Sequence, residues 1–100
     1  MGYRVTFSAL AERDLEEIVR FLARKNRAAA MRLGNALVDD ALPLARLPGR
    51  GLPVLTRPGY RRVLHGPWFL IFYRVNEARR LVEIARFWDA RQDPGLFTLA

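Results

Sequence analysis

The sequence predicts an α+β domain. In this fold an N-terminal strand and an antiparallel two-helix hairpin precede a three-stranded antiparallel meander, and the helices pack on one face of the sheet. Two observations predict it. Apolar residues recur at helical spacing over residues 9–44, and the last third holds apolar runs of strand length between turn residues. A chain of 100 residues with 51% hydrophobic side chains can bury one core, so we expect a single domain over residues 1–100.

The N-terminal strand and the first helix follow from local patterns. Residues 3–7 alternate between apolar and polar side chains, as in a half-buried strand. Ser8 ends this strand and suits the N-cap of a helix over residues 9–25. Acidic side chains come early in that helix and basic ones late, which is the order that the helix dipole favours. Its apolar face carries Ala11, Leu15, Ile18, Val19 and Leu22.

A second helix follows directly and makes the hairpin. Asn26 is a suitable N-cap for it. Pro43 removes a backbone donor and clashes with the preceding turn, so this helix should kink or stop near Ala41 or Leu42. The prolines and glycines of residues 48–59 then predict a loop. The apolar stripe of the second helix carries Ala30, Leu33, Leu37, Ala41 and Leu44.

The meander is predicted over residues 60–65, 68–75 and 81–88. A Gly66-Pro67 turn separates the first two strands, and residues 76–80 make the second turn. Residues 68–73 are apolar on both faces of a strand, so we expect them in the central strand, covered on one side by the helices.

The charge pattern indicates an anionic partner. The net charge is +7, and 16 of the 17 basic residues are arginines. No acidic residue lies between Asp40 and Glu77. We expect the arginines of this interval, with two later ones, to give the sheet a positive face or rim that attracts phosphodiesters or an acidic protein. The alternative is that they are solvated and pair with acidic residues of the helices. These arginines are Arg46, Arg50, Arg57, Arg61, Arg62, Arg74, Arg86 and Arg91.

Other candidate groups are fewer. His65 is the default general acid or base because its ordinary pKa lies near neutrality, although a histidine beside Gly66-Pro67 is also typical of a turn. Asp89, Arg91 and Asp93 form either a charged site or a solvated turn. Some aromatic residues of the strands could stack on bases, but half of a strand's side chains face the core, so most should pack there. These are Trp68, Phe69, Tyr73, Phe87 and Trp88.

Several classes of protein are disfavoured. The sequence has no phosphate-binding glycine loop, no dinucleotide fingerprint and no residue set at metal-ligand spacing, so we expect neither cofactor nor metal. It has no cysteine and therefore no disulfide or thiolate chemistry. It has no apolar run of membrane-spanning length, so we expect a cytoplasmic protein with no membrane partner.

Five motifs in order resemble the RelE/ParE toxin family of type II toxin-antitoxin systems. They are YRVTFS at residues 3–8, GYRRV at 59–63, LIFYRV at 70–75, VEI at 82–84 and RFW at 86–88, with Ala11, Asp14, Leu15, Ile18, Ala90 and Arg91. The resemblance covers nearly the whole chain. It implies the same helical hairpin on a sheet, and a cognate antitoxin whose disordered segment folds over the toxin in a hetero-oligomer.

The family implies two activities on one fold. RelE-like members cut mRNA on the ribosome, using basic residues and commonly a Tyr or His near the last strand. ParE-like members act on DNA gyrase. This chain has no Tyr after Tyr73, no His after His65, and Asp89 where many relatives have His. Arg61 matches a basic position of the RelE-like site, but Val63 and Leu70 stand where other cations are expected.

The ParE-like interpretation is therefore favoured: a binding toxin of DNA gyrase. Its contact surface for target or antitoxin would include residues 89–97. The nuclease alternative uses Arg61, Arg62 and Arg86 on the phosphate and His65 in proton transfer. A third possibility is an inactive homologue that only binds the antitoxin. The expected contact residues are Arg50, Arg57, Arg61, Arg62, Arg74, Arg86, Trp88, Asp89 and Arg91.

Overall fold

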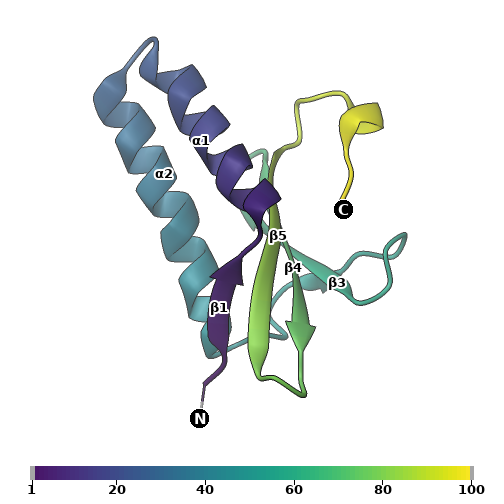
Figure 1. Ribbon diagram of the computed structural model, residues 1–100. Coiled ribbons are helices and arrows are strands. Elements are labelled where there is room, and N and C mark those ends of the chain that lie inside the picture. The colour runs from purple at the N-terminus through teal and green to yellow at the C-terminus, as the bar shows by residue number, and fades with distance from the viewer. Residues whose placement is uncertain (1, 100) are drawn as a thin grey trace.

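Two antiparallel helices lie on one face of a five-stranded sheet in the computed structural model, which describes residues 2–99 (Figure 1). The strands are ordered β1 (Arg4–Phe7), β5 (Leu81–Asp89), β4 (Phe69–Asn76), β3 (Tyr60–His65) and β2 (Leu52–Pro53). This confirms the predicted α+β class and the antiparallel meander. Strand β1 pairs with β5 in parallel, which the sequence did not reveal. Neither helix is long and apolar enough to cross a membrane.

The helices begin and end for the predicted local reasons. Helix α1 (Ala9–Ala23) has Ser8 as its N-cap, whose Oγ accepts from the Ala11 amide at 3.0 Å. Helix α2 (Arg27–Ala41) is capped in the same way by Asn26. It then tightens into the 3₁₀ helix η1 (Leu42–Ala45), which contains Pro43, so the predicted stop is confirmed. Helix α1 is two residues shorter than expected because residues 24–25 form the turn to α2.

The two faces of the sheet differ. On β4, Phe69, Ile71 and Tyr73 face the helices and are at most 7% exposed. Phe72 and the exposed Arg74 alternate with them and face away from the helices, on what we call the open face. Strand β4 is central, as predicted, but Trp68 lies in the preceding turn rather than in the strand. The core is completed by side chains of both helices and of β3 and β5: Ala11, Leu37, Ala41, Val63, Val82, Ile84 and Phe87, with Leu44 of η1.

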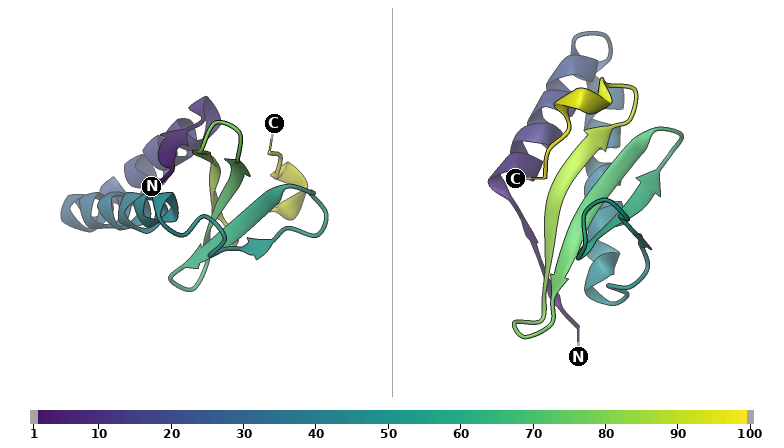
Figure 2. Two further views of the ribbon diagram at one scale, coloured as in Figure 1. Left: turned by 90° about the horizontal axis from the view of Figure 1, so that it is seen from below. Right: turned by 90° about the vertical axis from the view of Figure 1, so that its right-hand side faces the viewer.

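The C-terminal segment crosses to the open face. After β5 the chain turns through the short 3₁₀ helix η2 (Pro94–Leu96) and folds back along the sheet, on the side away from the helices (Figure 2). The Phe97 ring centre lies 4.7 Å from that of Phe72 and 5.0 Å from that of Trp88. This segment therefore covers part of the open face, although nothing in its sequence predicted a return to the sheet.

Helix α1 replaces β1 along the outer edge of β5. Strand β1 pairs with β5 only as far as Ile84. Beyond that point the Ser8 hydroxyl donates to the Ala85 carbonyl at 2.9 Å. The Phe87 amide donates to Asp14 Oδ2 at 3.1 Å. Side chains of the cap and the helix thus satisfy backbone groups that a longer strand would otherwise bind.

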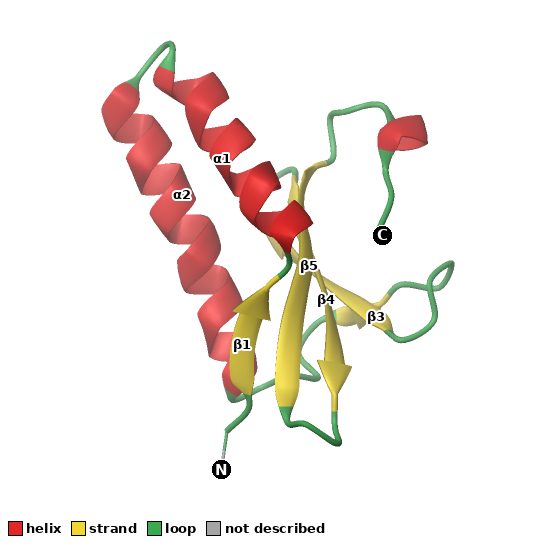
Figure 3. Cartoon of the chain, viewed as in Figure 1, coloured by secondary structure: helices red, strands yellow, loops and turns green. Residues whose placement is uncertain are grey.

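The loop predicted over residues 48–59 is tied to the sheet by two side chains, and it contains the short strand β2 (Figure 3). The buried Tyr73 hydroxyl donates to the Pro48 carbonyl at 2.7 Å and accepts from the Gly51 amide at 2.8 Å. Arg61 donates to the Gly51 carbonyl at 2.7 Å. Burial raises the pKa of the Tyr73 phenol, so it remains a neutral donor. A Cβ on Gly51 would lie 2.8 Å from the Arg62 carbonyl oxygen, so glycine is required there.

We expect Tyr73→Phe to destabilise the protein by about 1–3 kcal/mol, because the buried Gly51 amide loses its acceptor. Urea unfolding followed by circular dichroism would measure this loss. The matched control is Tyr60→Phe, since Tyr60 is half-buried and donates no side-chain hydrogen bond within residues 2–99. Equal stability of the two variants would contradict the anchoring role of Tyr73.

Candidate functional site

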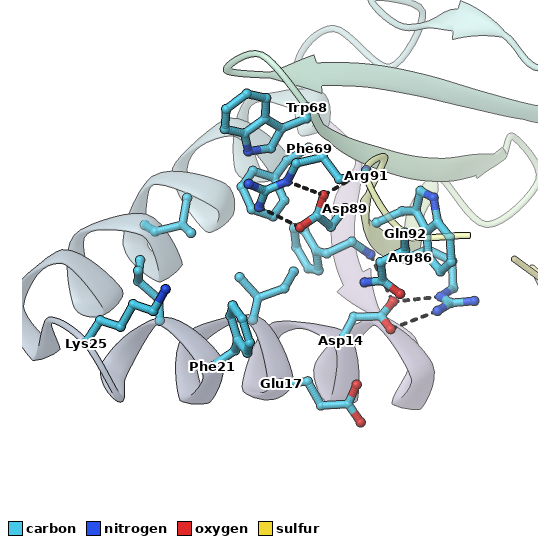
Figure 4. A pocket seen from close by; sticks show the side chains of 15 residues that line it. Asp14, Glu17, Phe21, Lys25, Trp68, Phe69, Arg86, Asp89, Arg91 and Gln92 are labelled. Carbon is cyan, nitrogen blue, oxygen red and sulfur yellow. Dashed lines mark hydrogen bonds and ion pairs between the residues drawn. The ribbon is translucent and has the colours of Figure 1, made fainter. Parts of the chain in front are cut away.

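A groove of about 590 Å³ runs between α1 and the free half of the β5 edge (Figure 4). We call it the α1–β5 groove. Helix α1 forms one wall, along which Asp14, Glu17, Phe21 and Lys25 follow one another. Phe21 is 64% exposed although it is a large apolar residue. The apolar lining comprises Ile18, Phe21, Leu22, Leu33, Trp68, Phe69, Phe87 and Trp88.

A buried ion pair closes one end of the groove. Arg86 donates from Nε and Nη2 to the two carboxylate oxygens of Asp14, at 2.7 and 2.9 Å. Its third contact is the Thr98 carbonyl, which accepts from Nη1. Arg86 is 7% exposed and Asp14 is 9% exposed. Each nitrogen of the guanidinium therefore donates a hydrogen bond to a group within the protein. Arg86 is buried, so the prediction that it lies on an exposed positive rim is wrong.

A second ion pair lies at the opposite wall. Arg91 donates to both oxygens of Asp89, at 3.0 and 2.7 Å, and its guanidinium carbon lies 4.4 Å from the Trp68 ring centre. The hydrogen bonds from Arg91 hold the pKa of Asp89 below its ordinary value. Asp93 does not join this pair, because its carboxylate caps η2 through the Gly95 amide. The groove is therefore apolar, with most of its charges paired internally.

The other predicted site residues are divided between the two faces of the sheet. Arg61 and His65 pair across the sheet with Tyr73 and Phe69, so they lie on the helix-facing side. His65 Nδ1 forms a hydrogen bond with Asp40 Oδ2 of α2. Arg62 pairs with Phe72 and lies on the open face. The sequence-predicted residues therefore do not form one site, because adjacent residues of a strand point to opposite faces.

The remaining arginines differ in what they contact. Arg74 donates to Glu83 of the neighbouring strand at 2.8 Å. Arg46 and Arg50 are exposed, and the Arg57 guanidinium donates to the carbonyl of Thr56. The structure gives no ion pair within residues 2–99 to Arg50, Arg57 or Arg62. Pairing with helix acids, the alternative for the arginine cluster, holds for Arg86 but not for these three.

A second, shallower depression lies on the open face. It has a volume of about 570 Å³, and its lining comprises residues 52–56 with Arg62, Phe72 and Phe97. We call it the open-face hollow. It shares no lining residue with the α1–β5 groove. Arg62 is the charged residue of its lining. The hollow therefore combines one of the arginines expected on the positive surface with the exposed apolar side chains of Leu52 and Leu55.

Residues 5–94 match the family described as the ParE toxin of the type II toxin-antitoxin system, parDE. The chain belongs to the ParE toxin family. This match confirms the family resemblance of the sequence motifs. The protein is therefore a ParE-family toxin of a type II toxin-antitoxin system. A search of curated proteins finds no match.

Solved structures share the fold. A chain of the chromosomal ParDE toxin-antitoxin system from P. aeruginosa has a TM-score of 0.76 at 20% identity, covering 87% of this chain and 95% of that one. A chain of the RelBE2 toxin-antitoxin complex from Mycobacterium tuberculosis has a TM-score of 0.69 at 27% identity, covering 89% and 99%. A mutant of the E. coli toxin RelE in the free state has a TM-score of 0.52 at 19% identity, covering 90% and 85%.

Sequence reasoning missed the role of Asp14, although a signal for it was present. Asp14 lies three residues after Ala11 and four before Ile18, so it belongs to the buried stripe of α1 rather than to its solvated side. A carboxylate on an apolar stripe requires a buried partner. The α1–β5 groove gave no such signal, because residues distant in the sequence form its walls.

Proposed function

We propose that this ParE-family protein is a toxin that acts by binding DNA gyrase, without cutting RNA, and that a cognate antitoxin neutralises it. One observation carries the non-nuclease part: the candidate catalytic groups do not converge. RNA cleavage needs a proton acceptor, a donor and a cation around one phosphate. Here His65 is bound to Asp40 on the helix-facing side, whereas Arg62 is on the open face.

The buried state of Arg86 supports the same conclusion. A phosphate could reach its guanidinium only after displacing Asp14 and the C-terminal segment, both of which it contacts. Arg61 is similarly engaged, because it binds the carbonyl of Gly51. Gyrase as the target is supported by the parDE description of the family and by the ParE-like motifs of the sequence.

The α1–β5 groove is the proposed antitoxin site. An extended groove with an apolar lining suits one face of an amphipathic segment that folds on binding. The segment would cover exposed apolar groups such as Phe21 and Trp68, which are costly to leave in water. Because the ion pairs at one end of the groove and in its wall opposite α1 are internal, apolar burial supplies most of the affinity in this groove. Salt dependence then comes from the net charge of +7 on the whole chain rather than from direct contact with any one arginine.

A specific observation favours the nuclease as a second candidate. Arg62, Phe72 and Arg86 occupy one row across three strands of the open face, so two cations flank one position. The likeness to the RelBE2 complex is consistent with it. This alternative requires the C-terminal segment to leave Arg86, and it still lacks an acid-base group beside the row.

Tightly repressed expression of the toxin in cells, with and without the antitoxin, tests the proposal. The readouts are transcript cleavage and the DNA-damage response. We expect DNA damage without mRNA cuts, and we expect His65→Gln to be as toxic as the wild type, because Gln can still bind Asp40. Thermal unfolding would verify that this variant is folded. Ribosome-phased cuts that vanish in His65→Gln would establish the nuclease instead, and harmless wild-type expression would indicate an inactive antitoxin-binding homologue.

A further inference from the structure

We infer that the open-face hollow is the surface on which this toxin holds its target, and that the target presents an acidic segment with apolar side chains. The inference rests on the proposed function, which identifies the target as DNA gyrase. It adds a site and a recognition chemistry, separate from the α1–β5 groove.

Exposed apolar side chains gather around the hollow. Leu52 is 65% exposed and Leu55 is 93% exposed, and both line it. Leu64 is 59% exposed and lies two residues from Arg62 on the same face of β3. Leu96, beside Phe97 in the C-terminal segment, is 68% exposed. Two exposed leucines in one depression, with two more beside its lining residues on the strand or along the chain, are typical of a protein-binding surface.

The charge around the hollow has one sign. Residues 52–56 lie within the interval between Asp40 and Glu77 that contains no acidic residue, and none of the lining residues is acidic. Arg62 is exposed in the lining without an ion pair within residues 2–99, and Arg57 follows directly on the lining segment. A partner that buries these guanidiniums must bring carboxylates, because a desolvated cation requires a compensating charge.

Three occupants of different chemistry can be compared. A nucleic acid would require a strongly polar interface with many cations, whereas this lining is mostly apolar with one arginine. A second copy of the chain carries the same arginines and a net charge of +7, so two such faces repel. An acidic protein segment that places apolar side chains between Leu52 and Leu55 satisfies both features.

The two surfaces are independent in their residues. The groove lies between helix and strand, whereas the hollow lies across β3 and β4 on the other face. A change in the hollow should therefore weaken target binding and leave antitoxin binding intact. That separation makes the inference testable without knowledge of the contacts on the target.

The test measures binding of the full-length toxin to purified DNA gyrase holoenzyme and to the cognate antitoxin. The variants are Arg62→Glu and, independently, Leu55→Ser, which removes apolar surface without reversing charge. The matched control is Arg32→Glu, since Arg32 is exposed on α2 and lines neither site. We expect both hollow variants to lose gyrase affinity by roughly tenfold or more, with the control and all antitoxin affinities within about twofold of wild type.

Other outcomes are equally decisive. If wild type binds gyrase and neither hollow variant is weakened, the inference is overturned while the proposed function stands. If wild type does not bind gyrase, the proposed target is wrong, and toxicity in cells then tests the hollow. Loss of toxicity in both hollow variants but not in Arg32→Glu supports the hollow as the binding surface for another acidic protein. Retained toxicity in the hollow variants overturns the inference. Binding of a labelled single-stranded RNA or duplex DNA that Arg62→Glu abolishes would also overturn it, in favour of a nucleic-acid surface.

Discussion

Replacing Asp14 by alanine should destabilise the protein by about 3–5 kcal/mol, which is the range for breaking a buried ion pair from one side. Arg86 would stay buried without the carboxylate that accepts from its Nε and Nη2, and the Phe87 amide would lose its acceptor. A loss of this size is comparable to the whole stability of a small domain, so the variant should be largely unfolded at 37 °C. Chemical denaturation of the purified protein would measure it.

Two control variants separate the buried ion pair from a general effect on α1. The double variant Asp14→Leu/Arg86→Met removes both charges and should recover most of the lost stability, because no unpaired ion remains. Glu16→Ala removes the partner of Arg20 in an exposed pair with a 3.9 Å separation. That change should shift stability by less than about 0.5 kcal/mol. A single Asp14→Ala variant as stable as Glu16→Ala would contradict the assigned role.

Replacing Phe21 by alanine should weaken antitoxin binding by roughly 30- to 1,000-fold, which corresponds to about 2–4 kcal/mol for truncation of a central aromatic anchor. Phe21 protrudes from α1 into the α1–β5 groove and is largely exposed in the free toxin, so its removal should cost the partner contact rather than the fold. Surface plasmon resonance or calorimetry with the cognate antitoxin would measure the change.

Met31→Ala is the matched control for this prediction. Met31 is an exposed apolar residue of the other helix, with 57% exposure, and it does not line the groove. We expect unchanged antitoxin affinity for it, and unchanged thermal stability for both variants. Equal affinity of Phe21→Ala and wild type would show that the antitoxin docks elsewhere. In cells, Phe21→Ala should be toxic even when the antitoxin is coexpressed.

Much of the fold was predictable because its determinants are local. Ser8 and Asn26 satisfy amides only three residues away, and Pro43 ends α2 through its own ring. The apolar runs between turn residues likewise assigned β3, β4 and β5 and their order in the meander. This reasoning missed the short strand β2 in the loop. Strand β2 is two residues long, which is too few positions for a strand pattern to be visible.

The candidate site was less predictable, because its parts are distant in the sequence. Asp14 and Arg86 are 72 residues apart, and His65 and Asp40 are 25 apart. Composition marked the arginines as one cluster, but the alternation of β3 sends Arg61 and Arg62 to opposite faces, and burial removes Arg86 from the surface. A charge pattern along the chain carries no information on which faces of the sheet remain open to solvent.

The sequence by itself determined the helices, their caps, the meander and the family, since each depends on side chains within one turn, one strand or one motif. Only the tertiary structure decided that β1 lies parallel to β5, that α1 satisfies the rest of the β5 edge, and that Phe97 returns to the open face. The physical reason is that a strand edge or an apolar face constrains only the chemistry of its partner. Which distant segment supplies that partner depends on the packing of the whole chain.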